Sequence, residues 1–389
     1  MPESRGAAYV VQKAEERHIG LIELWALDTR GRLQVLTVLR QELEAVLELG
    51  LPIASRRIAA VPDETWVLVA DPLTFATFPR IGHDALVARL ACDLQTPDGA
   101  PVARCARTIL KRQLGRAKAL GYSVYMSAGL DTRFVEASAA GSAYQSLSPS
   151  RARTLARDAA LRAESLGIGV AGFGLDADSG LWTYELSTVD PLSLADALVS
   201  LRRVLGDTAS SADAYATFMA RPWAGAARAS LALSLALVEG NTTASAGTDV
   251  ERRLPTDHER AFAARLARDL GAIELVARPT VNGRQTPGAM SVAPASSADG
   301  GTAVRVLGAD ANANPYLFLA LALGAALDAT VEVERAALAS EGALALRFPL
   351  LGDVLGAELL AELIAHADAD ARAWQAQVTA LDLDLDRAC

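Results

Sequence analysis

The chain has 389 residues, of which 51% are hydrophobic and 21% charged, and its formal net charge is −9 at pH 7. This balance is typical of a folded globular protein and excludes a largely disordered chain. The arginines are scattered through an acidic sequence, which argues against a surface for the phosphates of nucleic acid. We therefore expect a folded protein that does not bind nucleic acid.

The cysteines and the apolar segments indicate where such a protein works. Cys92, Cys105 and Cys389 lack the spacing of a zinc site, and their odd number argues against a disulfide framework. The N-terminus has no apolar stretch typical of a signal peptide. The longest apolar run, 317–326, is too short to span a bilayer. These features predict a cytoplasmic protein without a membrane partner.

Short strands and turns make up the first part of the chain. Its expected elements are strands over 19–27, 33–39, 65–71 and 85–94 and a helix over 40–48. Asp98 and Gly99 predict a tight turn. We interpret this part as a small mixed domain over residues 1–105.

The pattern changes at residue 106, where an amphipathic helix begins and runs to a stop at Gly121. Longer helices and strands then alternate. The expected elements are strands over 122–137 and 228–238, an extended segment over 167–186, and helices over 149–166, 192–205, 258–270, 315–327 and 356–380. We interpret residues 106–389 as a second, larger domain.

Leucine alternates with small side chains in the predicted strand 228–238. Leu231, Leu233, Leu235 and Leu237 share one face and are expected to pack in a core. The opposite face carries only serine and alanine, at positions 230, 232, 234 and 236. Such a face either packs closely against another element or lines a cavity from which larger functional side chains are missing.

Several separated stretches, taken in order, resemble the glutamine synthetase family. They are Asp28 to Leu33, Asp71-Pro72 with Thr74-Phe75, Cys92-Asp93 with Gly99, Phe218-Met219 with Pro222, Pro279 to Asn282, and Asp310 to Leu317. The strand with alternating leucines falls on the family's H-x-H-x-S-L stretch. The resemblance covers roughly residues 15–329.

The resemblance implies an α+β fold and a chemistry. It implies an N-terminal β-grasp domain followed by a glutamine synthetase-type catalytic domain, an antiparallel sheet with flanking helices. Members of the family activate a carboxylate with ATP and then let ammonia or an amine attack it. Two divalent metal ions hold the triphosphate in that chemistry, and such ions need hard oxygen ligands.

The family's metal ligands are only partly present here. The resemblance places Asp131, Asp178 and Glu185 at ligand positions, but it also places Arg133, Ser230 and Ala303 at three others. Because a guanidinium can pair with two carboxylates, we expect Arg133 to stand in for one ion beside Asp178 and Glu185. The alternative interpretation makes all three of these residues solvent-facing surface charges.

The resemblance also implies further site residues. Candidate catalytic positions are Asp63, Glu64 and Arg305, candidate substrate-binding positions are Arg284 and Arg305, and candidate nucleotide-binding positions are Ser234 and Arg221. The family's flap glutamate falls on Met290.

Two hypotheses follow for function. The favoured one is a pseudoenzyme that kept the fold, lost most metal and catalytic residues, and binds a small molecule or a partner subunit. The alternative is a repurposed ATP-dependent carboxylate-amine ligase that forms gamma-glutamyl amides in a rebuilt site. ATP and Mg²⁺ are expected to bind weakly or not at all. The resemblance implies a homo-oligomeric ring, such as a dodecamer, or a hetero-oligomer with an active paralogue.

Overall fold

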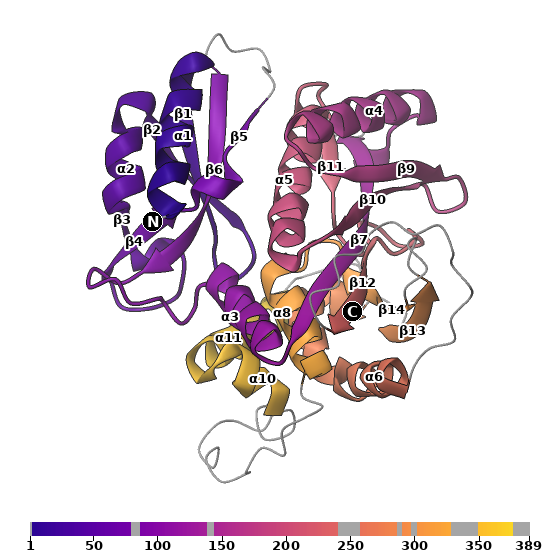
Figure 1. Cartoon of the computed structure of the whole chain (residues 1–389). Helices are drawn as coiled ribbons and strands as arrows, with labels where there is room; N and C mark the ends of the chain where they lie inside the picture. The colour runs from indigo at the N-terminus through magenta and orange to yellow at the C-terminus, as the bar shows by residue number, and fades with distance from the viewer. Residues whose placement is uncertain are drawn as a thin grey trace, which may run out of the picture.

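The computed structural model describes residues 2–78, 86–137, 144–239, 257–285, 290–296, 302–327 and 349–375. It shows a small part built from the beginning of the chain beside a larger part built from the remainder (Figure 1). The two parts contain separate hydrophobic clusters. One cluster is formed within residues 10–105, and the other extends from helix α3 to the C-terminal helices with a few residues of the small part. The division at residue 105 stays a prediction.

The small part is a sheet with two covering helices. Strand β1 (Ile19–Leu27) pairs antiparallel with β2 (Leu33–Leu39) and parallel with β6 (Leu86–Gln95). The full strand order is β2-β1-β6-β4-β3, with β5 paired to β6. The other elements are α1 (Pro2–Glu16), α2 (Leu43–Leu49), β3 (Leu51–Ala54), β4 (Thr65–Ala70) and β5 (Ala76–Thr77). The β-grasp assignment for this sheet stays a prediction.

The strands predicted for the small part are confirmed, but helix α1 was not expected from the sequence. Its apolar side is narrow, because Val10 and Ala14, one turn apart, are the fully buried contacts that it makes. Strand β3 was also missed, since it is short and contains Pro52. Tertiary packing rather than local pattern therefore defines both elements.

The larger part is built on an antiparallel sheet with helices packed on it. The strand order is β13-β14-β12-β7-β10-β9, and β8 and β11 pair with β7. The strands are β7 (Tyr122–Ala137), β8 (Tyr144–Ser146), β9 (Val170–Asp176), β10 (Leu181–Val189), β11 (Tyr215–Thr217), β12 (Ser230–Glu239), β13 (Ser291–Ser296) and β14 (Thr302–Asp310). The helices are α3 (Ala106–Ala119), α4 (Pro149–Ser165), α5 (Pro191–Ser210), α6 (Asp257–Ala277), α7 (Val281–Gln285), α8 (Pro315–Leu327), α10 (Pro349–Leu355) and α11 (Ala357–Gln375). The predicted mixed fold with an antiparallel sheet is confirmed.

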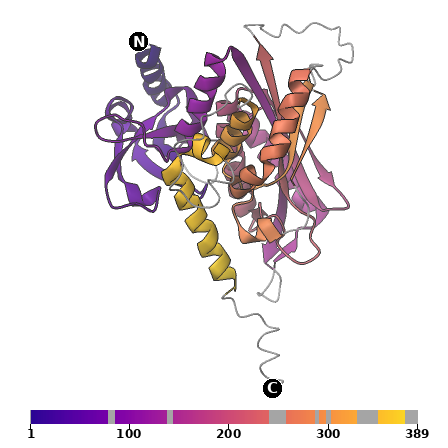
Figure 2. The ribbon, with the colours of Figure 1, turned by 90° about the horizontal axis from the view of Figure 1, so that it is seen from below.

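Helix α8 forms the centre of the core. All of its residues are buried, and it lies between the small part and the large sheet in the view of Figure 2. This explains why residues 315–327 are apolar all round rather than amphipathic. Within the described part of the chain, no helix is both long and apolar enough to cross a membrane.

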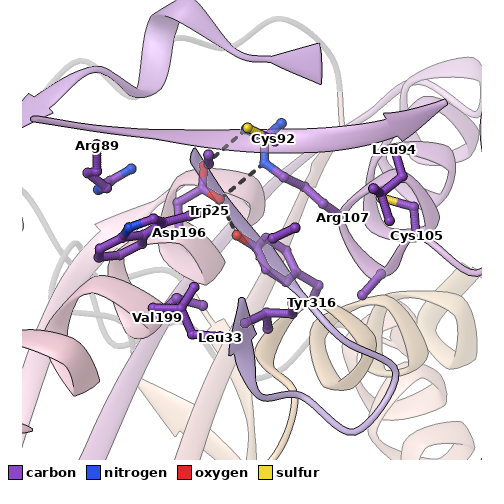
Figure 3. A pocket seen from close by; sticks show the side chains of 14 residues that line it. Trp25, Leu33, Arg89, Cys92, Leu94, Cys105, Arg107, Asp196, Val199 and Tyr316 are labelled. Carbon is purple, nitrogen blue, oxygen red and sulfur yellow. Dashed lines mark hydrogen bonds and ion pairs between the residues drawn. The ribbon is translucent and has the colours of Figure 1, made fainter. Parts of the chain in front are cut away.

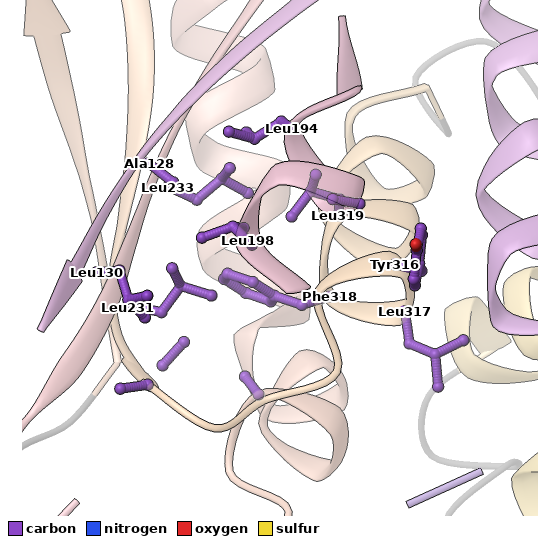
Figure 4. Packing of buried hydrophobic residues seen from close by; sticks show 14 of the residues in the cluster. Ala128, Leu130, Leu194, Leu198, Leu231, Leu233, Tyr316, Leu317, Phe318 and Leu319 are labelled. Atoms are coloured by element: carbon purple, nitrogen blue, oxygen red, sulfur yellow. The ribbon is translucent and has the colours of Figure 1, made fainter. Parts of the chain in front are cut away.

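The leucine face of β12 packs as predicted. Leu231, Leu233 and Leu235 are fully buried, and Figure 4 shows the first two pointing at Leu198 of α5 and Phe318 of α8. Leu237 is only partly buried, because the core ends before the last residues of the strand. Removing apolar area of this kind from water is the main source of stability in the larger part.

A buried arginine joins the two parts. Arg107 of α3 donates from Nη2 to Asp71 at 2.8 Å and to Asp196 of α5 at 3.0 Å, and its Nη1 lies 3.3 Å from Asp93. The hydroxyl of Tyr316 also donates to Asp196 (Figure 3). Asp71, Asp93 and Tyr316 all belong to stretches that resemble the glutamine synthetase family, so the structure gives three of those stretches a common role in joining the parts.

Candidate functional site

The face of the large sheet that carries small side chains is a wall opposite the helical core. Strand β12 pairs with β7 so that Ala232 lies beside Gly129 and Ser234 beside Ser127. Strand β10 continues the wall on one side, where Glu185 lies beside Gly129. Strand β14 continues it on the other side. These strands bring together most residues that the resemblance places at a metal and nucleotide site.

Both oxygens of the Asp131 carboxylate accept hydrogen bonds within this wall. Its Oδ1 accepts a hydrogen bond from Thr183 Oγ1 at 2.6 Å. Its Oδ2 accepts from both the backbone N and the Oγ of Ser230 at 2.9 Å. Ser230 occupies a position where the resemblance expects a histidine ligand. The replacement thus turns a ligand position into a hydrogen-bond donor that satisfies the neighbouring carboxylate.

Arg133 is buried but does not pair with the expected carboxylates. Its guanidinium lies over the ring of Trp223 with a carbon-to-centroid distance of 5.2 Å, and Nη2 donates to the Ser179 carbonyl at 2.7 Å. Burial lowers the pKa of Arg133, while the charge of Asp131 acts in the opposite direction. Among the described residues it forms no ion pair with Asp178 or Glu185, so that part of the prediction is not met.

The two remaining carboxylates, Asp178 and Glu185, occupy different places in the structure. Asp178 is exposed in the turn between β9 and β10, and its backbone N donates to Asp176 Oδ1 at 3.0 Å. Glu185 is exposed on the wall, and its carboxylate lies over Gly129. A side chain at position 129 would therefore meet Glu185. Only Glu185 keeps the position on the wall that a metal ligand needs.

Strand β14 contributes Ala303 and Arg305. Ala303 is buried and supplies no ligand atom. Arg305 lies beside Ser234 of β12, is partly buried, and its Nε has no hydrogen-bond partner in the described part of the chain. The wall therefore carries the guanidinium groups of Arg133 and Arg305, the hydrogen-bonded carboxylate of Asp131, the exposed carboxylate of Glu185 and small groups.

This donor set does not fit two divalent ions. Magnesium ions are held through carboxylate oxygens together with phosphate and water. Asp131 is occupied by three donors, and Arg133 brings positive charge to a neighbouring position. Among residues that the structure describes, no group of three or more His, Cys, Asp or Glu side chains is arranged to hold a metal.

Arg221 and Arg284 have structural contacts. The backbone N of Arg221 donates to Asn282 Oδ1 at 3.0 Å, and Asn282 Nδ2 donates to the Arg221 carbonyl at 2.8 Å. Arg284 donates to the carbonyls of Arg278 at 3.2 Å and Pro279 at 3.0 Å. These bonds connect two stretches that resemble the family, and they direct Arg284 to the backbone.

Asp63 and Glu64 lie on the small part and are exposed. Asp63 forms an ion pair with Arg56. The backbone N of Glu64 donates to Ser55 Oγ at 3.0 Å. Neither side chain belongs to the wall, so the structure does not bring these two residues together with the other candidate site residues.

The sequence interpretation missed a second buried charge cluster at the end of the wall. Asp310, which is fully buried, lies beside Ser230 in the sheet and pairs with Arg228. Its Oδ2 lies 1.7 Å from where a Cβ on Gly283 would stand, which explains why a glycine is needed there. The signal was present in the sequence, since Asp310 begins one of the stretches that carries the resemblance.

Asp310 is expected to make stability depend on pH. Burial raises its pKa from 3.8 to about 6 despite the opposing charge of Arg228. The folded protein therefore binds this proton more tightly, and the free energy of unfolding falls as pH rises from about 4 to about 6. Relative to an Asp310→Asn variant, the parent should lose about 3 kcal/mol between pH 4 and 7 in urea unfolding.

The partly exposed Asp207, which pairs with Arg203 one helical turn away, provides the matched control for this experiment. Asp207→Asn should leave the pH profile of the parent unchanged. A profile for Asp310→Asn that runs parallel to that of the parent would contradict the assignment.

The sheet, its wall and the helical core define a class of protein. Residues 103–337 match the family model described as the glutamine synthetase catalytic domain, which is more than half of the chain. The chain belongs to the glutamine synthetase family.

Individual relatives agree with this assignment. The chain is 27% identical to a glutamine synthetase of Mycolicibacterium smegmatis over 83% of this chain and 80% of the relative. It is 25% identical to a glutamine synthetase of Clostridium saccharobutylicum over 82% of this chain and 78% of the relative. A solved structure of a GmaS complex with ADP has a TM-score of 0.79 at 20% identity and covers 98% of this chain and 99% of its own. At that identity the structural likeness shows the fold alone.

Proposed function

We propose that this chain is a pseudoenzyme of the glutamine synthetase family that acts by binding a small molecule or a partner subunit. The observation that carries the proposal is the hydrogen bonding of Asp131. Its two carboxylate oxygens accept hydrogen bonds from Thr183 and Ser230. Beside it, Arg133 is fixed between Trp223 and the Ser179 carbonyl.

Transfer of a phosphoryl group from ATP develops negative charge that divalent ions neutralise. Glu185 is an exposed carboxylate on the wall, whereas Asp178 lies out in the turn and position 303 is alanine. Arg133 is held against the ring of Trp223 and supplies no oxygen ligand for a divalent ion. ATP and Mg²⁺ are therefore proposed to bind weakly or not at all.

The pseudoenzyme proposal is tested directly by measuring turnover of ATP. Release of ADP from Mg-ATP should be measured with glutamate and either ammonium or methylamine as acceptor, using an active glutamine synthetase as positive control. We expect no ADP release above the rate without protein. Release that requires both glutamate and an amine would contradict the pseudoenzyme and support the alternative.

The alternative is a carboxylate-amine ligase with a rebuilt site. It rests on Glu185 and Arg305, which are both retained on the wall, one exposed and the other partly so. A carboxylate substrate could pair with Arg305 while Glu185 positions an amine. This arrangement still lacks the ligands for a metal-bound triphosphate, so we place it second.

Assembly belongs to the proposal as well. The resemblance implies a ring of copies of this chain, or a mixed ring with an active family member. Asp63 and Glu64 are exposed on the small part, and Glu185 is exposed on the wall. A neighbouring subunit could bring those carboxylates to the wall. The cytoplasmic location stays a prediction.

A further inference from the structure

A cavity lies away from the wall, where the two parts of the chain meet. It has a volume of about 350 Å³, within the range of small-molecule sites. The turn after β1 forms one side through Thr29 to Arg32, and α5, the end of α6, the turn before α8 and α11 form the rest. In Figure 2, helix α11 runs from the meeting point of the two parts toward the C-terminus. A ligand here would contact both parts at once.

The residues lining this cavity contain polar atoms without partners. Asn314 is 4% exposed, and its Nδ2 has no hydrogen-bond partner in the described part of the chain. The same holds for Asn312 Oδ1, His366 Nδ1, and both Nε and Nη2 of Arg202. Buried polar groups are nearly always hydrogen-bonded, because leaving one unpaired costs about 1–3 kcal/mol. Their concentration around one cavity indicates that polar partners belong in it.

The charge of the lining is positive. Arg202 donates from Nη1 to the Ala313 carbonyl at 2.8 Å but has no carboxylate partner among the described residues. Burial lowers its pKa to about 10. Arg30 and Arg32 add two cations from the small part, and Arg32 is paired with Asp28. Asp370 is the one acidic residue of the lining. An anion would therefore pair with a partly buried cation that has no carboxylate partner among the described residues.

We propose that this cavity binds a small organic anion that carries a carboxylate and at least one further hydrogen-bonding group. The carboxylate pairs with Arg202 and Arg30, and the second polar group bonds to the amides of Asn312 and Asn314. Inorganic phosphate would satisfy the cations but would leave much of the cavity unfilled. Because Arg30 belongs to the small part and Arg202 to the larger part, the ligand stabilises their contact. The proposal does not depend on the state of the metal wall.

The test measures binding to the full chain by calorimetry and by thermal unfolding. The probes are L-glutamate, succinate and inorganic phosphate, with glycerol as the uncharged control. We expect at least one carboxylate to bind and to raise the melting temperature in a concentration-dependent manner. Arg30→Gln removes an exposed cation and should weaken binding about tenfold, which corresponds to one charge-assisted hydrogen bond.

Three further variants test whether the ligand binds in this cavity. Ala367→Phe places a large side chain in the cavity and should abolish binding while leaving every charge in place. Arg203→Gln, next to Arg202 but outside the cavity, and Arg305→Gln, on the wall, should leave binding unchanged. Absence of binding by both carboxylates, binding by phosphate alone, or binding that survives Ala367→Phe would overturn the proposal. Loss of binding in Arg305→Gln instead would mean that the ligand binds at the wall.

Discussion

Replacing Arg107 by alanine is expected to lower the free energy of unfolding by about 3–5 kcal/mol, as does breaking other buried ion pairs by removing one partner. The guanidinium is the main cation for Asp71 and Asp196, and it also lies near Asp93. Its removal leaves Asp196, which is 7% exposed, with only the Tyr316 hydroxyl as a polar side-chain donor among the bonds described. Urea unfolding followed by circular dichroism measures the loss.

Arg203 on helix α5 provides the matched control. It pairs with Asp207 one turn away at the surface, and pairs of this kind contribute about 0.3–0.5 kcal/mol. Arg203→Ala should therefore change stability far less than Arg107→Ala. A loss below about 1 kcal/mol for Arg107→Ala would mean that the joining role assigned to this residue is wrong.

The second large effect is a gain of metal-dependent nucleotide binding. A variant that combines Arg133→Glu, Ser230→His and Ala303→Glu restores ligands at three positions of the wall. It also removes the hydroxyl that now occupies Asp131 Oδ2. We expect Mg²⁺ or Mn²⁺ to tighten ATP binding to this variant by more than tenfold, since each added carboxylate supplies hard oxygen ligands.

The control for this gain is Arg133→Gln alone, which removes the cation without adding a ligand. It should show no metal dependence. If the triple variant folds, as judged by circular dichroism, and still shows no metal dependence, the positions inferred from the resemblance are not the metal positions of this chain.

The alternation along 228–238 was enough to predict which face of β12 packs in the core. The prediction was possible because side chains alternate between the two faces of a strand. The leucine face of β12 is the one that packs on α5 and α8. The same pattern indicated the small-residue wall. The expectation of a metal site on this wall came from the resemblance alone, because serine and alanine carry no chemical signal of their own.

The environment of Arg133 could not be predicted. The resemblance placed it near Asp178 and Glu185, but its direction depends on Trp223 and on the Ser179 carbonyl, which approach from other segments. The Arg107 network and the 350 Å³ cavity were missed for a related reason. Both form only where residues from distant parts of the chain meet, and no local pattern encodes such a meeting.

We propose above that the wall does not hold metal-bound ATP. The most direct measurement is a calorimetric titration of ATP into the unaltered chain with Mn²⁺ or Mg²⁺ and again with a chelator, using the triple variant as the positive control. We expect no difference between the two conditions for the unaltered chain. Binding that becomes at least tenfold tighter with the metal would contradict it, because Asp131 and Glu185 would then have to hold the ion with ligands that the wall does not show.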